Sequence, residues 1–237
     1  MNDPRPTAVI TGASGALGSN LTSRLRDSGW RVIAADIASV RTDSNPDITG
    51  LDVADADAVE HLAETAAAAG NFRLWVNAAG IFHVGPVAEA TVDDWHRIIA
   101  VNLTGTFNGC RAALPRLEVG GRIINVSSIA GQSGVTGIHP AYGASKAGVQ
   151  SLTAVYGKEG AKRGITCVAV APGVLESSMG NQFSADQQRK LEAATAFRRF
   201  GRVEEITEAI LFLADTARSG WINGTTIPVN GGAWTPY

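Results

Sequence analysis

Tyr142 and Lys146 have side chains suited to proton transfer, and they lie four residues apart in a stretch that predicts a helix. That spacing places the phenol and the ammonium on one helix face. A phenol with a pKa of about 10 is a poor base at neutral pH, but nearby positive charge favours its ionised form. Lowering that pKa by roughly 3 units corresponds to about 4 kcal/mol. Ser128 could donate a hydrogen bond to a developing alkoxide or ketone oxygen, so the three residues predict proton transfer at a secondary alcohol or ketone.

A glycine-rich loop follows the first predicted strand. The apolar run Ala8–Thr11 leads into glycines at positions 12, 15 and 18, after which an amphipathic helix is predicted. The missing side chains would let backbone N–H groups approach a pyrophosphate at the positive end of that helix. A plain tight turn is the alternative, but the strand before and the helix after favour a dinucleotide site. The residues expected to contact this cofactor are Gly12, Ser14, Gly15, Ala16, Leu17 and Gly18.

Asp36 ends the second predicted strand and indicates which dinucleotide is bound. A carboxylate there can accept hydrogen bonds from both adenosine ribose hydroxyls and would repel a 2′-phosphate. Position 15 is glycine, so the loop has no basic residue there to neutralise an extra phosphate. NAD is therefore predicted over NADP, with Ile37 beside Asp36 in the contact set, unless Arg41 folds back toward the ribose. The alternative is that Asp36 only caps a short helix.

Two further strand ends carry residues expected at the cofactor. In an open parallel sheet, ligands bind beyond the carboxyl ends of the strands. One segment follows the third predicted strand, and the other follows the fourth, where small residues permit close backbone approach. Each segment could equally be a helix cap or a turn. The residues added to the cofactor set are Asp52, Val53, Asn77, Ala78, Ala79 and Gly80.

Short β-branched runs alternate with Ala-rich helical stretches along the whole chain, which predicts an α/β fold with a doubly wound parallel sheet of the Rossmann type. We expect about seven strands, helices on both faces and one domain over residues 1–237. A polar excursion at about 174–200 is expected to act as a substrate lid. The predicted strands are Ala8–Thr11, Arg31–Asp36, Ile48–Asp52, Leu74–Asn77, Arg122–Ser127, Thr166–Ala171 and Thr226–Val229. The predicted helices are Ala16–Ser28, Ala54–Ala69, Val92–Arg116, Tyr142–Lys162 and Val203–Ala214.

Composition excludes several classes of function. The 237 residues carry a net charge of -2, which argues against nucleic-acid or anionic-membrane surfaces. No apolar run approaches the roughly 20 residues of a membrane span, and the start of the chain has no apolar signal segment. Cys110 and Cys167 lie in apolar surroundings, which predicts buried free thiols in a reducing compartment and a cytoplasmic protein. Four scattered histidines and two cysteines far apart in the sequence predict no metal site.

The order of motifs resembles that of the short-chain dehydrogenase/reductase family over essentially the whole chain. Besides the glycine loop, the motifs are Asn77-Ala78-Ala79-Gly80, Val101-Asn102-Leu103, Ser128, Tyr142-x-x-x-Lys146, Ala171-Pro172-Gly173 and Val229-Asn230-Gly231-Gly232. The resemblance implies that Asn102, Ser128, Tyr142 and Lys146 are the catalytic residues, Ser128 being the second serine of its pair. It also implies that Asn102 holds a relay water and that Lys146 holds the nicotinamide ribose. The implied nicotinamide contacts are Pro172, Gly173, Leu175 and Ser177, together with Tyr142 and Lys146.

The sequence departs from the family pattern in three places. Ala16 stands where short members of the family usually have glycine, and Ser128 lies one residue further from Tyr142 than usual. Ser177 replaces the usual threonine and keeps its hydroxyl. Taken one at a time, the catalytic residues also fit structural roles as an amphipathic helix pair, a turn serine and an asparagine in a helix kink.

The substrate pocket is expected to be lined by Phe82, His83, Gln132, Val135, His139, Met179 and Phe183. With no cation obviously placed for an anion, the preferred substrate is a neutral secondary alcohol or ketone, such as a cyclic alcohol or a diol. The leading prediction is an NAD-dependent dehydrogenase. The alternatives are a 3-oxoacyl thioester reductase using NADPH and a dinucleotide-binding regulator without activity. The resemblance further implies a homodimer or homotetramer, formed by helices near 104–116 and 142–162.

Overall fold

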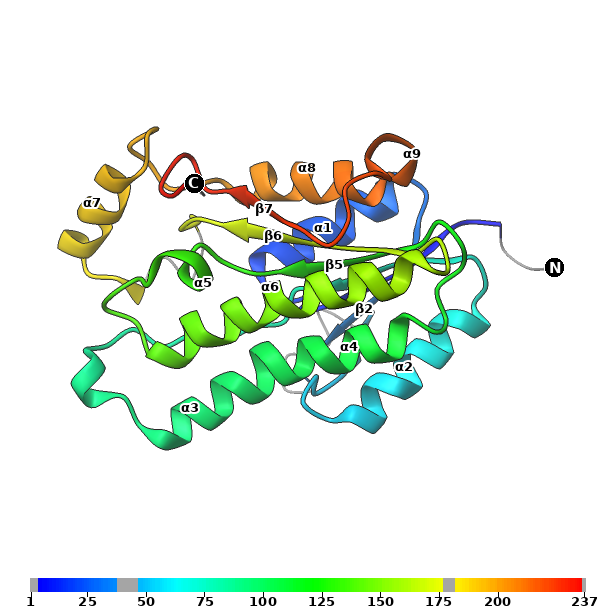
Figure 1. The fold of residues 1–237 in the computed structure, drawn as a ribbon, viewed down its shortest axis with the longest axis horizontal. Helices are drawn as coiled ribbons and strands as arrows, with labels where there is room; N and C mark the ends of the chain where they lie inside the picture. The colour runs from blue at the N-terminus through cyan, green and yellow to red at the C-terminus, as the bar shows by residue number, and fades with distance from the viewer. Residues whose placement is uncertain (1–3, 38–46, 177–181, 236–237) are drawn as a thin grey trace.

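The computed structural model describes residues 4–37, 47–176 and 182–235, and its centre is a seven-stranded sheet (Figure 1). The strands are β1 (Thr7–Thr11), β2 (Arg31–Asp36), β3 (Ile48–Gly50), β4 (Phe72–Asn77), β5 (Arg122–Val126), β6 (Thr166–Pro172) and β7 (Thr226–Val229). Their order is β3-β2-β1-β4-β5-β6-β7, and every neighbouring pair is parallel. The predicted α/β fold with a doubly wound parallel sheet is confirmed.

Helices cover both faces of this sheet, which explains why its central strands are apolar throughout (Figure 1). The helices are α1 (Ala16–Asp27), α2 (Ala56–Ala68), α3 (Val92–Ile99), α4 (Gly105–Ala113), α5 (Ala130–Ser133), α6 (Pro140–Ala161), α7 (Ala185–Ala194), α8 (Val203–Ala214) and α9 (Thr216–Ser219), with the short turns η2 (Val87–Glu89) and η3 (Ala100–Thr104). One buried cluster contains Leu21 of α1 and Ile206 of α8. The other contains Val59 of α2, Cys110 of α4 and Trp75 of β4.

The helix predicted over Val92–Arg116 is confirmed as a helical stretch, but it ends at Ala113 and contains a π-helical turn. α3 ends at Ile99, the π-helical turn η3 follows, and α4 runs from Gly105 to Ala113. A π turn adds one residue to the helical repeat, and hydrophobic periodicity does not show such an insertion. α4 then ends two residues before Pro115, which disfavours helix at the residue preceding it.

Other boundaries also differ from the predictions. β3 ends at Gly50 rather than Asp52, and α6 begins at Pro140, two residues before the predicted start. The excursion at 174–200 contains the helix α7, whose first turn is closed by a reciprocal capping box between Ser184 and Gln187. The four-residue helices α5 and α9 were not predicted, because so short a segment has no readable period.

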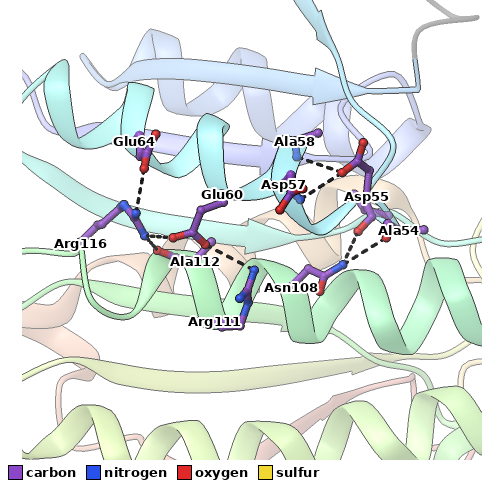
Figure 2. A network of polar contacts seen from close by, with 11 residues as sticks. Ala54, Asp55, Asp57, Ala58, Glu60, Glu64, Asn108, Arg111, Ala112 and Arg116 are labelled. Carbon is purple, nitrogen blue, oxygen red and sulfur yellow. Dashed lines mark hydrogen bonds and ion pairs between the residues drawn. The ribbon is translucent and has the colours of Figure 1, made fainter.

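The position of α4 is fixed by polar contacts with α2 (Figure 2). Arg116 forms ion pairs of 2.7 Å with Glu60 and 3.2 Å with Glu64. Partly exposed pairs of this kind contribute little stability. Asn108 is buried, and its amide donates to the Val53 carbonyl at 3.0 Å, so this contact has the larger effect on how α4 sits.

Arg122 is fully buried at the start of β5 and binds the chain around α8 and α9. Its guanidinium donates to the Ser219 hydroxyl at 2.7 Å and to the carbonyls of Ser219 at 3.0 Å, Ile222 at 3.1 Å and Leu213. Burial lowers the pKa of Arg122 to about 10. These acceptors are uncharged, so the charge is balanced by peptide and hydroxyl dipoles.

The two cysteines are free and buried, as predicted. They are far apart in the sequence but share one partner, since the Sγ atoms of Cys110 and Cys167 each lie 3.5 Å from an amide atom of Asn125. Within the described residues, no group of three or more metal-binding side chains comes together, and none of the helices has the length and apolarity to cross a bilayer.

Candidate active site

The glycine loop between β1 and α1 is built for close backbone approach. Gly12 has a φ of +71°, and a Cβ there would lie 2.6 Å from the Ala79 nitrogen. A Cβ on Gly18 would lie 2.1 Å from the Gly12 carbonyl oxygen. No side chain caps the N-terminus of α1, where Gly15 is the N-cap residue. This helix start therefore has the uncapped N–H groups that a pyrophosphate needs.

Asp36 lies at the end of β2 and contacts this loop. One of its carboxylate oxygens accepts hydrogen bonds from the Ser14 backbone N–H at 2.9 Å and from the Ser14 hydroxyl. The other accepts the Ile37 N–H at 2.7 Å. A carboxylate has about four lone-pair sites, so acceptor capacity for ribose hydroxyls remains. Arg41, which could have altered the cofactor prediction, lies outside the described residues.

The side chain of Asn77 is committed to the core and does not point toward the predicted cofactor site. Its side chain is buried, accepts from the Trp75 indole N–H at 2.7 Å and donates to Asn125 at 2.8 Å. A cofactor contact at this position would therefore be made by the backbone of Asn77 and not by its side chain. Gly80 does border the site, since a Cβ there would lie 3.4 Å from both the Lys146 Nζ and the Asn102 Oδ1.

Asp52 and Val53 lie in the turn between β3 and α2. Asp52 is exposed, and its carboxylate accepts the Ala54 N–H at 2.9 Å. Val53 is buried against Gly105 at the start of α4, where a glycine Cβ would lie 2.6 Å from a Val53 methyl carbon. These contacts stabilise the turn, and the Asp52 carboxylate faces solvent, so a cofactor contact at Asp52 stays a prediction.

The two serines after β5 have different partners. Ser127 is buried and donates its hydroxyl hydrogen bond to the Lys146 carbonyl at 2.9 Å, which ties β5 to α6. Ser128 is half-buried, and its hydrogen bond to Tyr142 acts to lower the pKa of that phenol. Of the pair, Ser128 is therefore the serine whose hydroxyl reaches the tyrosine.

Lys146 lies one helical turn beyond Tyr142 on α6, with its Nζ 5.9 Å from the centre of the tyrosine ring. The ammonium donates to the Val126 carbonyl at 2.8 Å, and the side chain is buried. Burial lowers the pKa of Lys146 to about 8 and raises the pKa of Tyr142 above its ordinary value. The predicted lowering of the phenol pKa needs the charge of an oxidised nicotinamide added to that of Lys146, so it stays a prediction; in the protein alone, desolvation outweighs the Ser128 hydrogen bond.

Asn102 is completely buried in the π-helical turn η3. Its side-chain oxygen accepts the Ile81 N–H at 2.8 Å, and its amide donates to the Ile81 carbonyl at 2.9 Å and to the Ser145 hydroxyl at 3.2 Å. Ser145 in turn donates to the Tyr142 carbonyl at 2.7 Å. The side chain of Asn102 thus joins the segment after β4 to α6, and its amide is occupied by protein partners.

An apolar wall lies beside Tyr142. Phe82 packs against the Tyr142 ring with centres 5.4 Å apart, and Phe183 packs against Phe82 at 5.7 Å. Both belong to a cluster with Val135 and Ile138. The structure therefore brings three of the predicted pocket residues, Phe82, Val135 and Phe183, together near the phenol.

His139 was predicted to line the pocket, and this prediction is wrong. The side chain is 5% exposed, and both ring nitrogens are hydrogen-bonded to the backbone.

The other predicted pocket residues have different environments. His83 is exposed, and its Nδ1 lies 3.5 Å from the Asp94 carboxylate. Gln132 is half-buried, with a buried side-chain oxygen that has no hydrogen-bond partner. Ser177 and Met179 lie outside the described residues.

Comparisons with known proteins identify the family. A family model described as enoyl-(acyl carrier protein) reductase matches residues 12–233. The chain is 34% identical to a 3-oxoacyl-[acyl-carrier-protein] reductase of Thermotoga maritima, over 94% of this chain and 96% of the relative. It belongs to the short-chain dehydrogenase/reductase family. It is also 32% identical to an acetoacetyl-CoA reductase of Allochromatium vinosum, over 95% and 97% of the two chains.

Solved structures of short-chain dehydrogenases agree with this membership. A Brucella melitensis protein, titled short-chain dehydrogenase/reductase SDR:glucose/ribitol dehydrogenase, superposes with a TM-score of 0.86 at 30% identity, covering 98% of this chain and 97% of that one. A Serratia marcescens short-chain dehydrogenase/reductase gives a TM-score of 0.88 at 27% identity, with 96% and 97% coverage. The protein is thus an oxidoreductase that acts on CH–OH groups.

This short-chain dehydrogenase has a hollow that sequence analysis predicted only in part. A cavity of about 380 Å³ lies beyond β6 and β7, bordered by Gly173 and Leu175, which were in the predicted cofactor set. Its other walls come from residues 195–206 and 228–232, and include the Arg199–Glu205 ion pair at 2.6 Å. The Val229–Gly232 motif predicted one wall of this cavity. Residues 195–206, which form the opposite wall, contain no sequence motif that predicted it.

Proposed function

We propose that this enzyme interconverts a secondary alcohol and its ketone by hydride transfer to and from NAD, with Asn102, Ser128, Tyr142 and Lys146 as its catalytic residues. The observation that carries the proposal is the placement of Tyr142. Its phenol contacts Ser128 and lies beside Lys146, at the carboxyl edge of the same sheet that bears the glycine loop. Ligands of open α/β sheets bind at this edge.

The residues of the glycine loop fit a dinucleotide. An added Cβ would collide with backbone at both Gly12 and Gly18, and the start of α1 is uncapped. Gly12, Ser14–Gly18, Asp36, Ile37 and Gly80 would hold the cofactor, and Asp36 supports NAD over NADP, because a carboxylate repels a 2′-phosphate. Bound there, the nicotinamide would supply or accept the hydride. Pro172, Gly173, Leu175 and Ser177 complete the proposed contacts.

The chain's own residues handle the proton. Tyr142 would take the hydroxyl proton of the alcohol, or return it to the ketone oxygen. Ser128 would donate a hydrogen bond to that same oxygen as negative charge develops on it. Lys146 would favour the phenolate by its charge, and its pKa of about 8 keeps a substantial part of it protonated near neutral pH. Asn102 would hold Ile81 and Ser145 in place around them.

The substrate class that the relatives favour is a 3-oxoacyl thioester. Two of the similar proteins are named for 3-oxoacyl-[acyl-carrier-protein] and acetoacetyl-CoA reduction. The apolar wall of Phe82 and Phe183 would suit an acyl chain. We therefore place this substrate first. A neutral secondary alcohol or diol is the second candidate. It is supported by the same apolar wall and by Asp36, because Asp36 favours NAD and NAD is the usual cofactor for alcohol oxidation.

The chemistry is tested by Tyr142→Phe. The ring and its packing on Phe82 are kept, while the proton-transferring hydroxyl is lost, so kcat should fall by about 10³-fold or more. NAD affinity, measured by fluorescence titration, should change little. A Tyr142→Phe enzyme that keeps most of its kcat would refute the proposed mechanism. Acetoacetyl-CoA and a panel of cyclic alcohols and diols, assayed side by side, decide the substrate.

The cofactor assignment is tested by Asp36→Ser. Removing the carboxylate removes the repulsion of a 2′-phosphate, so the NAD:NADP ratio of kcat/KM should fall by about 10- to 100-fold. Asp57→Ser, at an exposed carboxylate in the first turn of α2, is the matched control and should leave the ratio within about 3-fold. Wild-type enzyme that prefers NADP would show that the Asp36 argument is wrong.

We also propose that the enzyme works in the cytoplasm as a homodimer or homotetramer. The free buried thiols support a reducing compartment. Phe107 on α4 and Val155 on α6 are 41% and 59% exposed, and they lie on the two helices expected to pair between subunits. Light scattering of the wild type and of a Phe107→Glu, Val155→Glu variant would measure the assembly, which the paired carboxylates should disrupt.

A further inference from the structure

The reactive phenol lies in a part of α6 that needs support. Pro140 is the first residue of the helix, so Tyr142 is in the first turn, where backbone N–H groups have no partner within the helix. Lys146 is one turn further on and is held by the Val126 carbonyl. The proton donor is therefore more easily displaced than its lysine, unless something closes the start of the helix.

His139 closes it. Its Nδ1 accepts the Ala141 N–H at 3.1 Å, and its carbonyl accepts the Tyr142 N–H at 3.0 Å. Its Nε2 lies 3.1 Å from the Thr91 carbonyl. Because a carbonyl can only accept, Nε2 must carry the hydrogen and Nδ1 must be bare. The ring is thus neutral and held in one tautomer.

The same residue joins three segments around the phenol. The His139 N–H donates to the His83 carbonyl at 2.8 Å, which fixes the segment after β4 that also supplies Phe82. Thr91 is the N-cap of α3, where its hydroxyl accepts the Asp94 N–H at 3.1 Å. His139 is 5% exposed, so water does not readily replace these contacts.

We propose that His139 is a positioning residue that holds Tyr142 by capping the first turn of α6. The proposal rests on the proposed function only for the role of Tyr142.

Hydrogen exchange tests the cap without any substrate. The Ala141 and Tyr142 amides should exchange at least tenfold faster in His139→Ala than in wild type, relative to amides in the middle of α6. His139→Asn, which keeps a capping acceptor, should hold the exchange of the two amides within about threefold of wild type. Equal protection in wild type and His139→Ala would overturn the proposal.

Kinetics test the consequence for Tyr142. His139→Ala should lower kcat about tenfold with KM for NAD unchanged, and His139→Asn should recover at least half of the loss. His61→Asn, an exposed histidine replacement on α2, is the matched control and should match wild type. A His139→Asn enzyme no better than His139→Ala would overturn the capping role, as would a loss that appears only in KM for NAD. If Tyr142→Phe stays active while exchange behaves as expected, the proposed chemistry fails and the cap stands.

Discussion

Replacing Lys146 with methionine should make the protein more stable at neutral pH while it abolishes activity. The side chain is 4% exposed, and burial lowers its pKa from the ordinary 10.5 to about 8. The folded state therefore binds the proton more weakly than the unfolded chain does. Holding the ammonium in the fold costs stability at every pH below about 8, where both states are protonated. Methionine has a similar length and no charge, so it removes this cost.

The magnitude follows from the shift in pKa. Each pKa unit corresponds to about 1.4 kcal/mol, so the difference between 10.5 and about 8 corresponds to about 3 kcal/mol. Loss of the hydrogen bond to the Val126 carbonyl removes about 1 kcal/mol of stability. Lys146→Met should therefore raise the free energy of unfolding at neutral pH by about 2 kcal/mol. As pH rises from about 8 toward 10.5, the unfolded chain also loses its proton and the cost disappears. The variant should then be about 1 kcal/mol less stable than wild type.

Urea unfolding of the cofactor-free protein at several pH values measures this difference. Subtracting variant from wild type cancels the other groups that titrate in the same range. Lys158→Met, at an exposed position of the same helix, is the matched control and should shift the free energy by no more than about 0.5 kcal/mol at any pH. A Lys146→Met protein that is less stable than wild type by the same amount at neutral and alkaline pH would refute the reasoning.

The remaining predictions concern the loop and the buried arginine. Gly18→Ala should weaken NAD binding by more than tenfold in the fluorescence titration, because its Cβ would lie 2.1 Å from the Gly12 carbonyl oxygen. Arg122→Met should lower the free energy of unfolding by about 3 kcal/mol in urea, because it removes the guanidinium that donates to the carbonyls of Leu213, Ser219 and Ile222. An Arg122→Met protein as stable as wild type would mean that water satisfies these carbonyls.

The sheet was predictable because its signals are local and repeated. Seven apolar strands separated by helices are compatible with few topologies. Because the strands are then parallel, their carboxyl ends must lie at the same edge of the sheet. The π-helical turn at 100–104 was not predictable, because hydrophobic periodicity does not show it and the contacts of Asn102 with Ile81 are made across the fold. The short helices α5 and α9 were missed because four residues contain barely one period.

Residue types were easier to predict than their environments. Tyr142 and Lys146 were found from spacing alone, but the direction of the phenol pKa depends on burial, which spacing does not report. Asn77 follows a strand as a cofactor contact would, yet its amide is committed to Trp75 and Asn125 on neighbouring parts of the core. His139 shares this ambiguity, because a histidine beside an active site can bind substrate or cap a helix, and only its partners tell which.

The site also explains why family membership determines the reaction but leaves the substrate to experiment. The groups proposed for the chemistry lie at the sheet edge and on α6, where parallel register and helix spacing fix their relative positions. The groups that would contact the rest of the substrate, Phe82 and Phe183, come from the segment after β4 and the segment before α7. Such connecting segments vary most among proteins of one fold. At 32–34% identity to proteins named as thioester reductases, the framework is shared, and we expect these two aromatic segments to determine which ketone reaches Tyr142.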